Sequence, residues 1–221
     1  MDGSQLAAAE LLARARGLAG CTLGEVAGSC GVPLTAAPER AKGSVGRLIE
    51  RALGGVSEAA AAWTDFEGCE LKTLPVDASG RPRESTFVCH VQLAALAETS
   101  WEASRVRAKL ARVLWVPIES VQGVEHARRR VGSAFLWEMS ECEEDVLRAD
   151  YVELAERAAL GCVERVDARW GRALQLRPKG ANAAVRVRVQ TADGPVAVQP
   201  RAFYLRATFT RALVAAALRS T

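Results

Sequence analysis

The chain has 221 residues, 49% of them hydrophobic and 25% charged, which suffices for one large domain or two small lobes with a buried core. Lysine and arginine (29) exceed aspartate and glutamate (26) by three, and a net charge of +3 does not by itself indicate a nucleic-acid binder. No stretch is apolar over the length of a membrane span, and we expect no secretory signal after Met1.

The cysteine pattern argues against a zinc site. No two cysteines form a C-x-x-C pair, and the only histidines are His90 and His126. We therefore expect free thiols and a reducing, cytoplasmic location. The cysteines stand at positions 21, 30, 69, 89, 142 and 162.

The first fifty residues have helical patterns. Apolar residues recur at helical spacing over 5–19, and Thr22 followed by Glu25 is a capping-box pattern that opens a second, short helix. A third helix is expected over 45–53, ended by Gly54-Gly55.

The middle of the chain has strand patterns. Residues 69–76 and 85–93 read as strands, and the turn-rich segment 77–82 between them predicts a β-hairpin with a longer loop. A helix over 102–112 and a buried strand over 113–118 follow, and a further β segment spans 131–137.

The last third predicts a long helix over 142–160, then strands, then a closing helix over 210–218. Asp193-Gly194 is a hairpin-turn signal between two of the strands. The fold class is therefore mixed, α/β or α+β, with strands in the middle and helices at both ends. The strands are expected at 162–168, 172–177, 184–190 and 196–205.

The sharpest chemical feature is the triplet Asp65, Glu70 and Lys72. Side chains alternate along a strand, so Glu70 and Lys72 project to one face of strand 69–76, while Leu71 points the other way. Two nearby carboxylates repel, and a divalent cation relieves the repulsion, because hard oxygen ligands suit Mg²⁺. The Leu71 carbonyl could add a ligand, and the lysine could orient a water and offset phosphate charge. From spacing alone, an exposed Glu–Lys pair on a surface hairpin is the commoner explanation.

Basic residues gather in several short clusters. Such clusters suit phosphate contacts and base edges, but they are also typical of solvated faces, and the residues alone leave both readings open. The clusters are Arg105, Lys109 and Arg112 on the helix over 102–112, Arg128-Arg129-Arg130, Arg177-Pro178-Lys179, and Arg201 with Arg206 around Phe203-Tyr204.

Several long segments, in order through nearly the whole chain, resemble the MutH family of mismatch-repair endonucleases. The segment around 186–199 has no matching words. The matching segments are TLGEVAG (22–28), KGSVGRLIERALG (42–54), DFEGCELKTLPVDASGRPRESTFVC (65–89), WEASRVRAKLARVLWVPIE (101–119), RRVGSAFLW (129–137), LQLRPKGANA (174–183) and FYLRATFTRALV (203–214).

The resemblance implies a restriction-endonuclease-like fold with a central mixed sheet flanked by helices. It implies one such domain over 1–221, with two lobes around a DNA cleft. We expect the N-terminal lobe, about 1–100, to carry the triplet, and the lobe of about 101–221 to carry DNA-reading loops. It further implies a cytoplasmic, monomeric enzyme that uses Mg²⁺ to nick the unmethylated strand of double-stranded DNA at hemimethylated or unmethylated GATC sites, recruited by MutL with MutS upstream.

Carried over by position, the resemblance assigns roles to single residues. Glu50, Asp65, Glu70, Lys72 and Lys109 match catalytic positions, with Asp65, Glu70 and Leu71 as metal ligands. The stretch from Asp65 to Glu70 is shorter than in the best-known members, which predicts either a tighter loop before the strand or a shifted start of that loop. The positions that match DNA-contacting residues are Lys42, Gly43, Arg177, Pro178, Lys179 and, for sensing adenine methylation, Tyr204.

Two alternatives stay open at this point. The first is a restriction endonuclease that cuts GATC as part of a restriction–modification system. The chain length argues mildly against it, because related restriction enzymes carry a second, similar module. The second is a DNA-binding module without catalysis, for which the triplet would be incidental.

Overall fold

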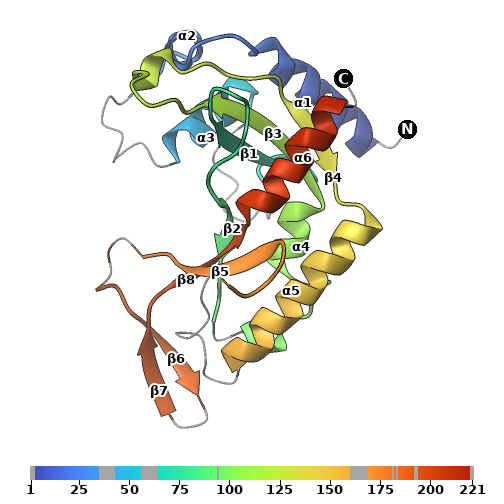
Figure 1. The fold of residues 1–221 in the computed structure, drawn as a ribbon, viewed down its shortest axis with the longest axis vertical. Helices are drawn as coiled ribbons and strands as arrows, with labels where there is room; N and C mark the ends of the chain where they lie inside the picture. Colours follow the sequence, from blue (N-terminus) through green and yellow to red (C-terminus); the bar gives the residue numbers. More distant parts are fainter. Residues whose placement is uncertain are drawn as a thin grey trace. The chain divides into compact units, whose positions relative to one another are not determined.

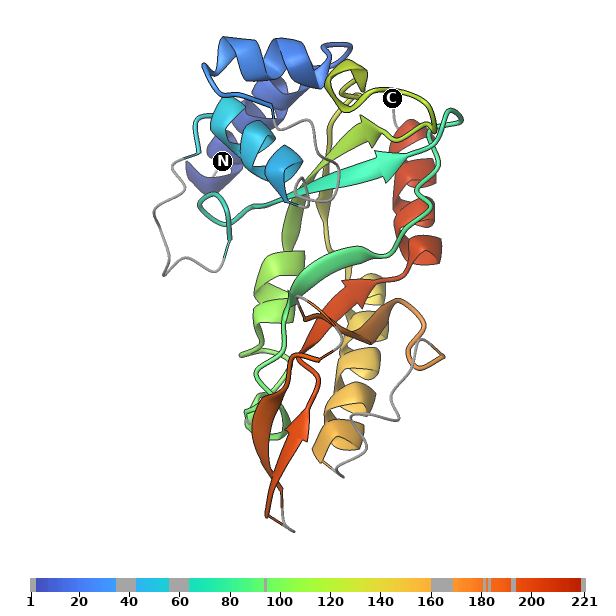
Figure 2. The same cartoon turned by 90° about the vertical axis from the view of Figure 1, so that its left-hand side faces the viewer.

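The computed structural model describes residues 3–34, 43–55, 64–93, 95–159, 169–180, 182, 184–191 and 194–219 (Figures 1 and 2). The chain forms two compact units. The first comprises Met1–Arg83, Ala111–Glu138 and Leu213–Thr221, and the second comprises Glu84–Leu110 and Met139–Ala212. The units thus interleave along the chain, whereas we had expected one division near residue 100. The reason is strand pairing, because residues after 111 return to pair with the strand that carries the triplet.

The first unit contains a three-stranded mixed sheet of order β1-β3-β4. β1 (Glu70–Val76) runs parallel to β3 (Arg112–Glu119), and β4 (Phe135–Glu138) pairs antiparallel with β3. The unit also contains α1 (Gly3–Gly17), α2 (Leu23–Ser29), α3 (Ser44–Ala52) and the short 3-10 helix η2 (His126–Arg128). The Thr22–Glu25 capping box opens α2, as predicted.

One apolar core joins the three helices to the sheet of this unit. It contains residues from α1, α2, α3, β1 and β3, among them Leu11, Leu23, Ile49, Leu71 and Leu114. Because Leu71 faces this core, its strand neighbours Glu70 and Lys72 project from the opposite face of β1. The helices therefore fix which face of the sheet carries the charged residues.

The predicted hairpin between 69–76 and 85–93 is wrong. β1 pairs in parallel with β3, and β2 (Thr86–His90) pairs antiparallel with β8 (Arg201–Leu205) in the second unit. The apolar run Val113–Val116 is almost fully buried, and a buried strand needs hydrogen-bonded neighbours on both sides. β1 and β4 are these neighbours of β3, and β1 therefore does not pair with β2, the next strand in the sequence.

The second unit contains an antiparallel sheet of order β2-β8-β5, with β5 at Leu174–Pro178. The long helix α5 (Glu141–Ala159) lies beside this sheet in Figure 1, and the Tyr151 and Phe203 rings join them with centroids 5.5 Å apart. The unit also contains the 3-10 helix η1 (Leu96–Glu98) and α4 (Arg105–Leu110). α6 (Ala207–Arg219) follows β8.

The strand predicted over 196–205 is two strands. β7 (Gly194–Val198) pairs antiparallel with β6 (Val187–Thr191), and β8 begins only at Arg201. Pro200 lies between them and lacks the N–H that a continuous strand would need. The β6–β7 hairpin confirms the turn signal, although Asp193 itself and the strand predicted over 162–168 lie outside the described residues.

Two smaller findings complete the fold. In the described part of the chain, no helix is long and apolar enough to cross a membrane. The cysteines that the structure describes, at 21, 30, 69, 89 and 142, are all free, as expected.

Candidate active site and nucleic-acid interface

Glu70 and Lys72 form an ion pair on one face of β1. The Lys72 ammonium donates to Glu70 Oε1, as strand alternation predicted. Glu70 is only 1% exposed, and the Lys72 side chain 12% exposed. An exposed surface pair, the commoner explanation for this spacing, is therefore wrong here. Burying a carboxylate is costly unless a cation and hydrogen bonds compensate, and such a buried pair is typical of functional sites.

The short connection before β1 closes as a tight turn. Phe66 and Cys69 exchange backbone hydrogen bonds of 2.9 and 3.1 Å, and Gly68 has the positive φ of 66° that the turn requires. The turn brings the exposed Asp65 side chain back to the strand, where its Oδ2 accepts the Leu71 amide at 3.0 Å. The turn thus presents the Asp65 carboxylate beside the residue that follows Glu70.

Glu50, on α3, lies within electrostatic reach of Asp65 and Glu70. Burial raises the pKa of Glu50, the negative charges of Asp65 and Glu70 raise it further, and Arg47 lowers it. Packing brings the end of α3 to the same place, because a Cβ built on Gly55 would lie 2.7 Å from Glu50 Cγ and 3.2 Å from the Phe66 ring. The structure therefore brings together four of the predicted site residues on or beside β1, and Glu50 lies within electrostatic reach of them. The four are Asp65, Glu70, Leu71 and Lys72.

The donor chemistry of this group fits a divalent cation. Mutual repulsion among three carboxylates is what a bound cation offsets, and carboxylate and carbonyl oxygens are hard ligands. Among the described residues, no group of three or more His, Cys, Asp and Glu side chains is assembled closely enough to hold a metal alone. The predicted ligand set, which consists of the Asp65 and Glu70 carboxylates and the Leu71 carbonyl, does not require such a group of three side chains.

Lys109 lies in the second unit, half-buried in the last turn of α4. The basic helix face predicted with it is wrong in its third member, because α4 ends at Leu110. Arg112 instead begins β3, where its Nε donates to Glu138 at 2.8 Å. Arg105 remains on the helix and exposed.

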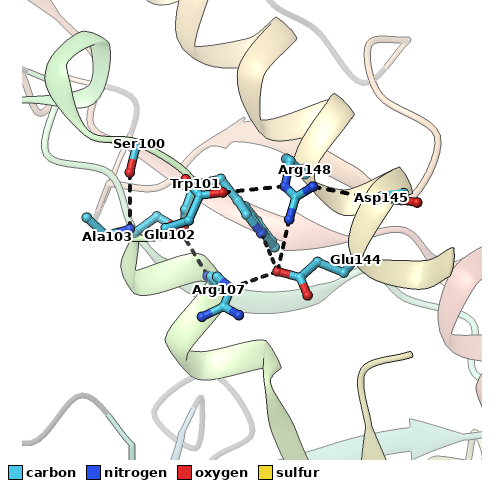
Figure 3. Close-up of polar contacts among 9 residues, drawn as sticks. Ser100, Trp101, Glu102, Ala103, Arg107, Glu144, Asp145 and Arg148 are labelled. Carbon is cyan, nitrogen blue, oxygen red and sulfur yellow. Dashed lines mark hydrogen bonds and ion pairs between the residues drawn. The ribbon is translucent and has the colours of Figure 1, made fainter. Parts of the chain in front are cut away.

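A polar network ties α4 to α5 within the second unit (Figure 3). Glu144 Oε1 accepts from the buried Trp101 indole at 2.8 Å and from Arg107 Nε at 2.7 Å. Arg148 lies 3.5 Å from the same oxygen and 3.6 Å from Glu102. The network therefore holds in place the helix that carries Lys109.

The Glu144→Gln variant is expected to lose about 1 kcal/mol of unfolding free energy at neutral pH, because its hydrogen bonds are no longer charge-assisted. The Arg107 and Trp101 hydrogen bonds lower the pKa of Glu144 in the folded protein. A carboxyl pKa that is lower in the folded protein stabilises the fold above the unfolded pKa, and this stabilisation is lost as pH falls through the folded pKa. Urea titrations should therefore show that the difference in unfolding free energy between the variant and the wild type becomes smaller at acid pH. The exposed Glu156→Gln on the same helix is the control, and a difference independent of pH would contradict the prediction.

Arg177, Lys179 and Tyr204 lie together on the sheet of the second unit. Arg177 lies over the Tyr204 ring at 5.5 Å, and Lys179 lies over the Phe87 ring at 5.5 Å. Phe87 and Tyr204 contact edge to face, with centroids 5.6 Å apart. Two cations on two aromatic rings form a surface suited to phosphates and base edges.

Phe87 was not predicted at this place, and His90 was expected to be structural; their rings lie 5.3 Å apart beside Tyr204. The sequence signal for Phe87 was an aromatic residue in a predicted strand, and such a residue usually indicates core packing rather than a binding site. Of the remaining predicted contacts, Pro178 ends β5, and Gly43 is exposed with a positive φ of 85° at the start of α3. Lys42 lies outside the described residues.

Comparison with known proteins identifies the family. A family model for the DNA mismatch repair enzyme MutH matches residues 56–150. The DNA mismatch repair proteins MutH of Salmonella typhimurium and Salmonella newport are each 49% identical over 208 residues, which is 93% of this chain and 90% of theirs. That of Salmonella paratyphi C is 48% identical over the same lengths.

The mixed sheets flanked by helices agree with a restriction-endonuclease-like fold, and with these relatives they define a DNA endonuclease that acts in mismatch repair. The chain belongs to the MutH family. The family matches confirm the resemblance read from the sequence segments, including the long block that carries the triplet.

Proposed function

We propose that this protein is a Mg²⁺-dependent endonuclease that nicks the unmethylated strand of double-stranded DNA at hemimethylated GATC sites. The observation that carries the proposal is the buried Glu70–Lys72 pair on β1 with the Asp65 carboxylate returned to the same strand. Such a site can place charge and a water against a phosphodiester, which is what hydrolysis of this bond requires.

In this proposal Asp65 and Glu70, with the Leu71 carbonyl, hold the cation. Bound there, Mg²⁺ would supply positive charge against the phosphate oxygens in the transition state. Lys72 orients the attacking water and offsets phosphate charge from its place beside Glu70. Glu50 adds negative charge that strengthens cation binding, and Lys109 contributes a positive charge toward the phosphate.

The residues proposed to read the DNA sequence lie in the second unit. Arg177, Pro178 and Lys179 read the GATC sequence, and Tyr204 senses methylation of adenine. The contact of Arg177 with Tyr204 supports this, because a residue that meets the methyl group would then adjoin one that reads a base. Lys42 and Gly43 contact the DNA backbone. The enzyme acts as a cytoplasmic monomer and is recruited by MutL, with MutS upstream.

A single experiment tests the proposal. The protein is incubated with Mg²⁺ and a hemimethylated GATC duplex labelled on both strands, with and without MutL, and the cut strand is mapped. We expect one nick, in the unmethylated strand, stimulated by MutL. Cleavage of both strands without MutL would indicate a restriction enzyme, and no cleavage at any divalent cation concentration would indicate a DNA-binding module. The similarity to mismatch repair proteins over 93% of the chain favours the first outcome.

A further inference from the structure

Asp150 is a buried acidic residue outside the active site. It lies on α5 and is 4% exposed. Its carboxylate accepts backbone amides from three consecutive residues: Arg172 at 2.8 and 2.9 Å, Ala173 at 2.7 Å and Leu174 at 2.8 Å. Charge-assisted hydrogen bonds of this number and length fix the position of the amides closely.

The turn that meets Asp150 is shaped around the carboxylate. Gly171 has a positive φ of 78°, and a Cβ built on it would lie 1.9 Å from the Leu174 carbonyl oxygen and 3.3 Å from Asp150 Cγ. Only glycine can occupy this position without displacing the backbone. The turn at Gly171 and the Asp150 carboxylate are therefore complementary in shape.

The contact between Asp150 and this turn lies at the start of β5. The strand begins at Leu174, the last of the three residues whose amides Asp150 accepts. A second anchor ties the same turn to the end of β8, since the Arg206 amide donates to the Ala173 carbonyl at 2.8 Å. Together they set the register in which Leu174 pairs with Leu205 and Gln175 with Tyr204.

The register of β5 decides where its polar end points. In a strand, a slip of one residue turns every side chain to the other face. In the observed register, Arg177 faces the Tyr204 ring at 5.5 Å, and Lys179 reaches the Phe87 ring. A slip by one residue would remove Arg177 from this cluster and would also turn the fully buried Leu174 and Leu176 out of the core.

We propose that Asp150 is a positioning residue for sequence recognition, which fixes the register of β5 and so the placement of Arg177, Pro178 and Lys179. The inference rests on the proposed function, because it assumes that these residues read GATC. Asp150 acts through the backbone of 172–174 and touches neither DNA nor the reacting atoms.

The test begins with the wild-type protein. Hydrogen exchange should be slow at the amides of Arg172, Ala173 and Leu174, although Arg172 is in an exposed turn. Fast exchange at these amides would overturn the proposal whether or not any variant folds. The wild type is then assayed for nicking at GATC and at duplexes with one base pair of the site replaced, which gives a discrimination ratio.

The Asp150→Asn variant places an amide NH₂ among backbone donors and removes the charge. We expect its discrimination ratio to fall at least about tenfold, near the lower range of what one good base contact provides. Any unfolded fraction cancels in this ratio, so loss of stability alone would leave it unchanged. Glu156→Gln, an exposed substitution on the same helix, should keep the wild-type ratio.

The remaining outcomes separate the two proposals. An unchanged ratio in folded Asp150→Asn overturns the positioning role and leaves the proposed function intact. A wild type without preference for GATC overturns the proposed function itself, and the reading role with it. If Asp150→Asn does not fold, Gly171→Ala takes its place, because its Cβ displaces the Leu174 carbonyl while the carboxylate remains. The same fall in ratio is then expected, and no fall overturns the proposal.

Discussion

Glu70→Ala is expected to reduce nicking by about a thousandfold or more while DNA binding stays within a few-fold of wild type. The loss follows from the position of Glu70, whose carboxylate accepts from the Lys72 ammonium on the strand to which the Asp65 carboxylate is also bonded. In the proposed function, its removal takes away an oxygen ligand of the cation and the partner that holds the lysine. Single-turnover nicking and equilibrium binding to the same hemimethylated duplex measure the two effects separately.

Glu70→Gln is the matched control for the shape of the site. Glutamine keeps the volume of the buried side chain and one acceptor for Lys72, but not the charge. If charge is the requirement, both variants lose nicking alike. Both also lose stability, because each removes the anionic partner of the mostly buried Lys72 ammonium, and alanine loses more because it leaves a void in a nearly fully buried position. A Glu70→Ala protein that nicks GATC duplexes normally would show that the site lies elsewhere.

Local patterns predicted the elements of this protein well. The capping box at Thr22, the long helix α5 and the alternation that pairs Glu70 with Lys72 each depend on residues at most four positions apart, or on a repeated helical spacing. Interactions of this range are formed by the segment itself, so the sequence of the segment suffices to predict them.

Pairing between distant segments could not be predicted in the same way. The turn-rich segment after β1 satisfied the local rules for a hairpin, yet β1 pairs with β3, where Glu70 lies opposite Val113, and β2 pairs with β8. The choice depends on which strand is buried on both sides, a property of the folded core. For the same reason the two compact units interleave along the chain.

The candidate site shows the same division. The spacing singled out the triplet as a candidate, although spacing alone favoured an exposed Glu–Lys pair. The short stretch before Glu70 was noticed through the family resemblance. The electrostatic contribution of Glu50 and the aromatic partner Phe87 depend on packing between elements and were found only through the family resemblance or the structure. Asp150 carried no sequence signal, because an acid that accepts backbone amides resembles any other acid on a helix.

Lys72→Met is expected to abolish nicking and also to destabilise the fold by about 3–5 kcal/mol, because it leaves the Glu70 carboxylate buried without its cation. Methionine keeps most of the apolar stem, so the cost arises from the unpaired charge rather than from a void. Urea denaturation and single-turnover nicking measure the two losses.

The double variant Glu70→Gln/Lys72→Met separates the structural from the chemical role of the pair. With neither charge present, no buried carboxylate lacks its partner, so most of the stability lost in Lys72→Met should return while nicking stays absent.

Addition of Mg²⁺ should stabilise Lys72→Met more than the double variant, because only the former keeps the Glu70 carboxylate as a ligand. Equal effects of Mg²⁺ on both would argue against Glu70 as a ligand, and a double variant that nicks would exclude the pair from catalysis. Recovery of stability without recovery of nicking would show that the two charges are needed for the reaction rather than for the fold.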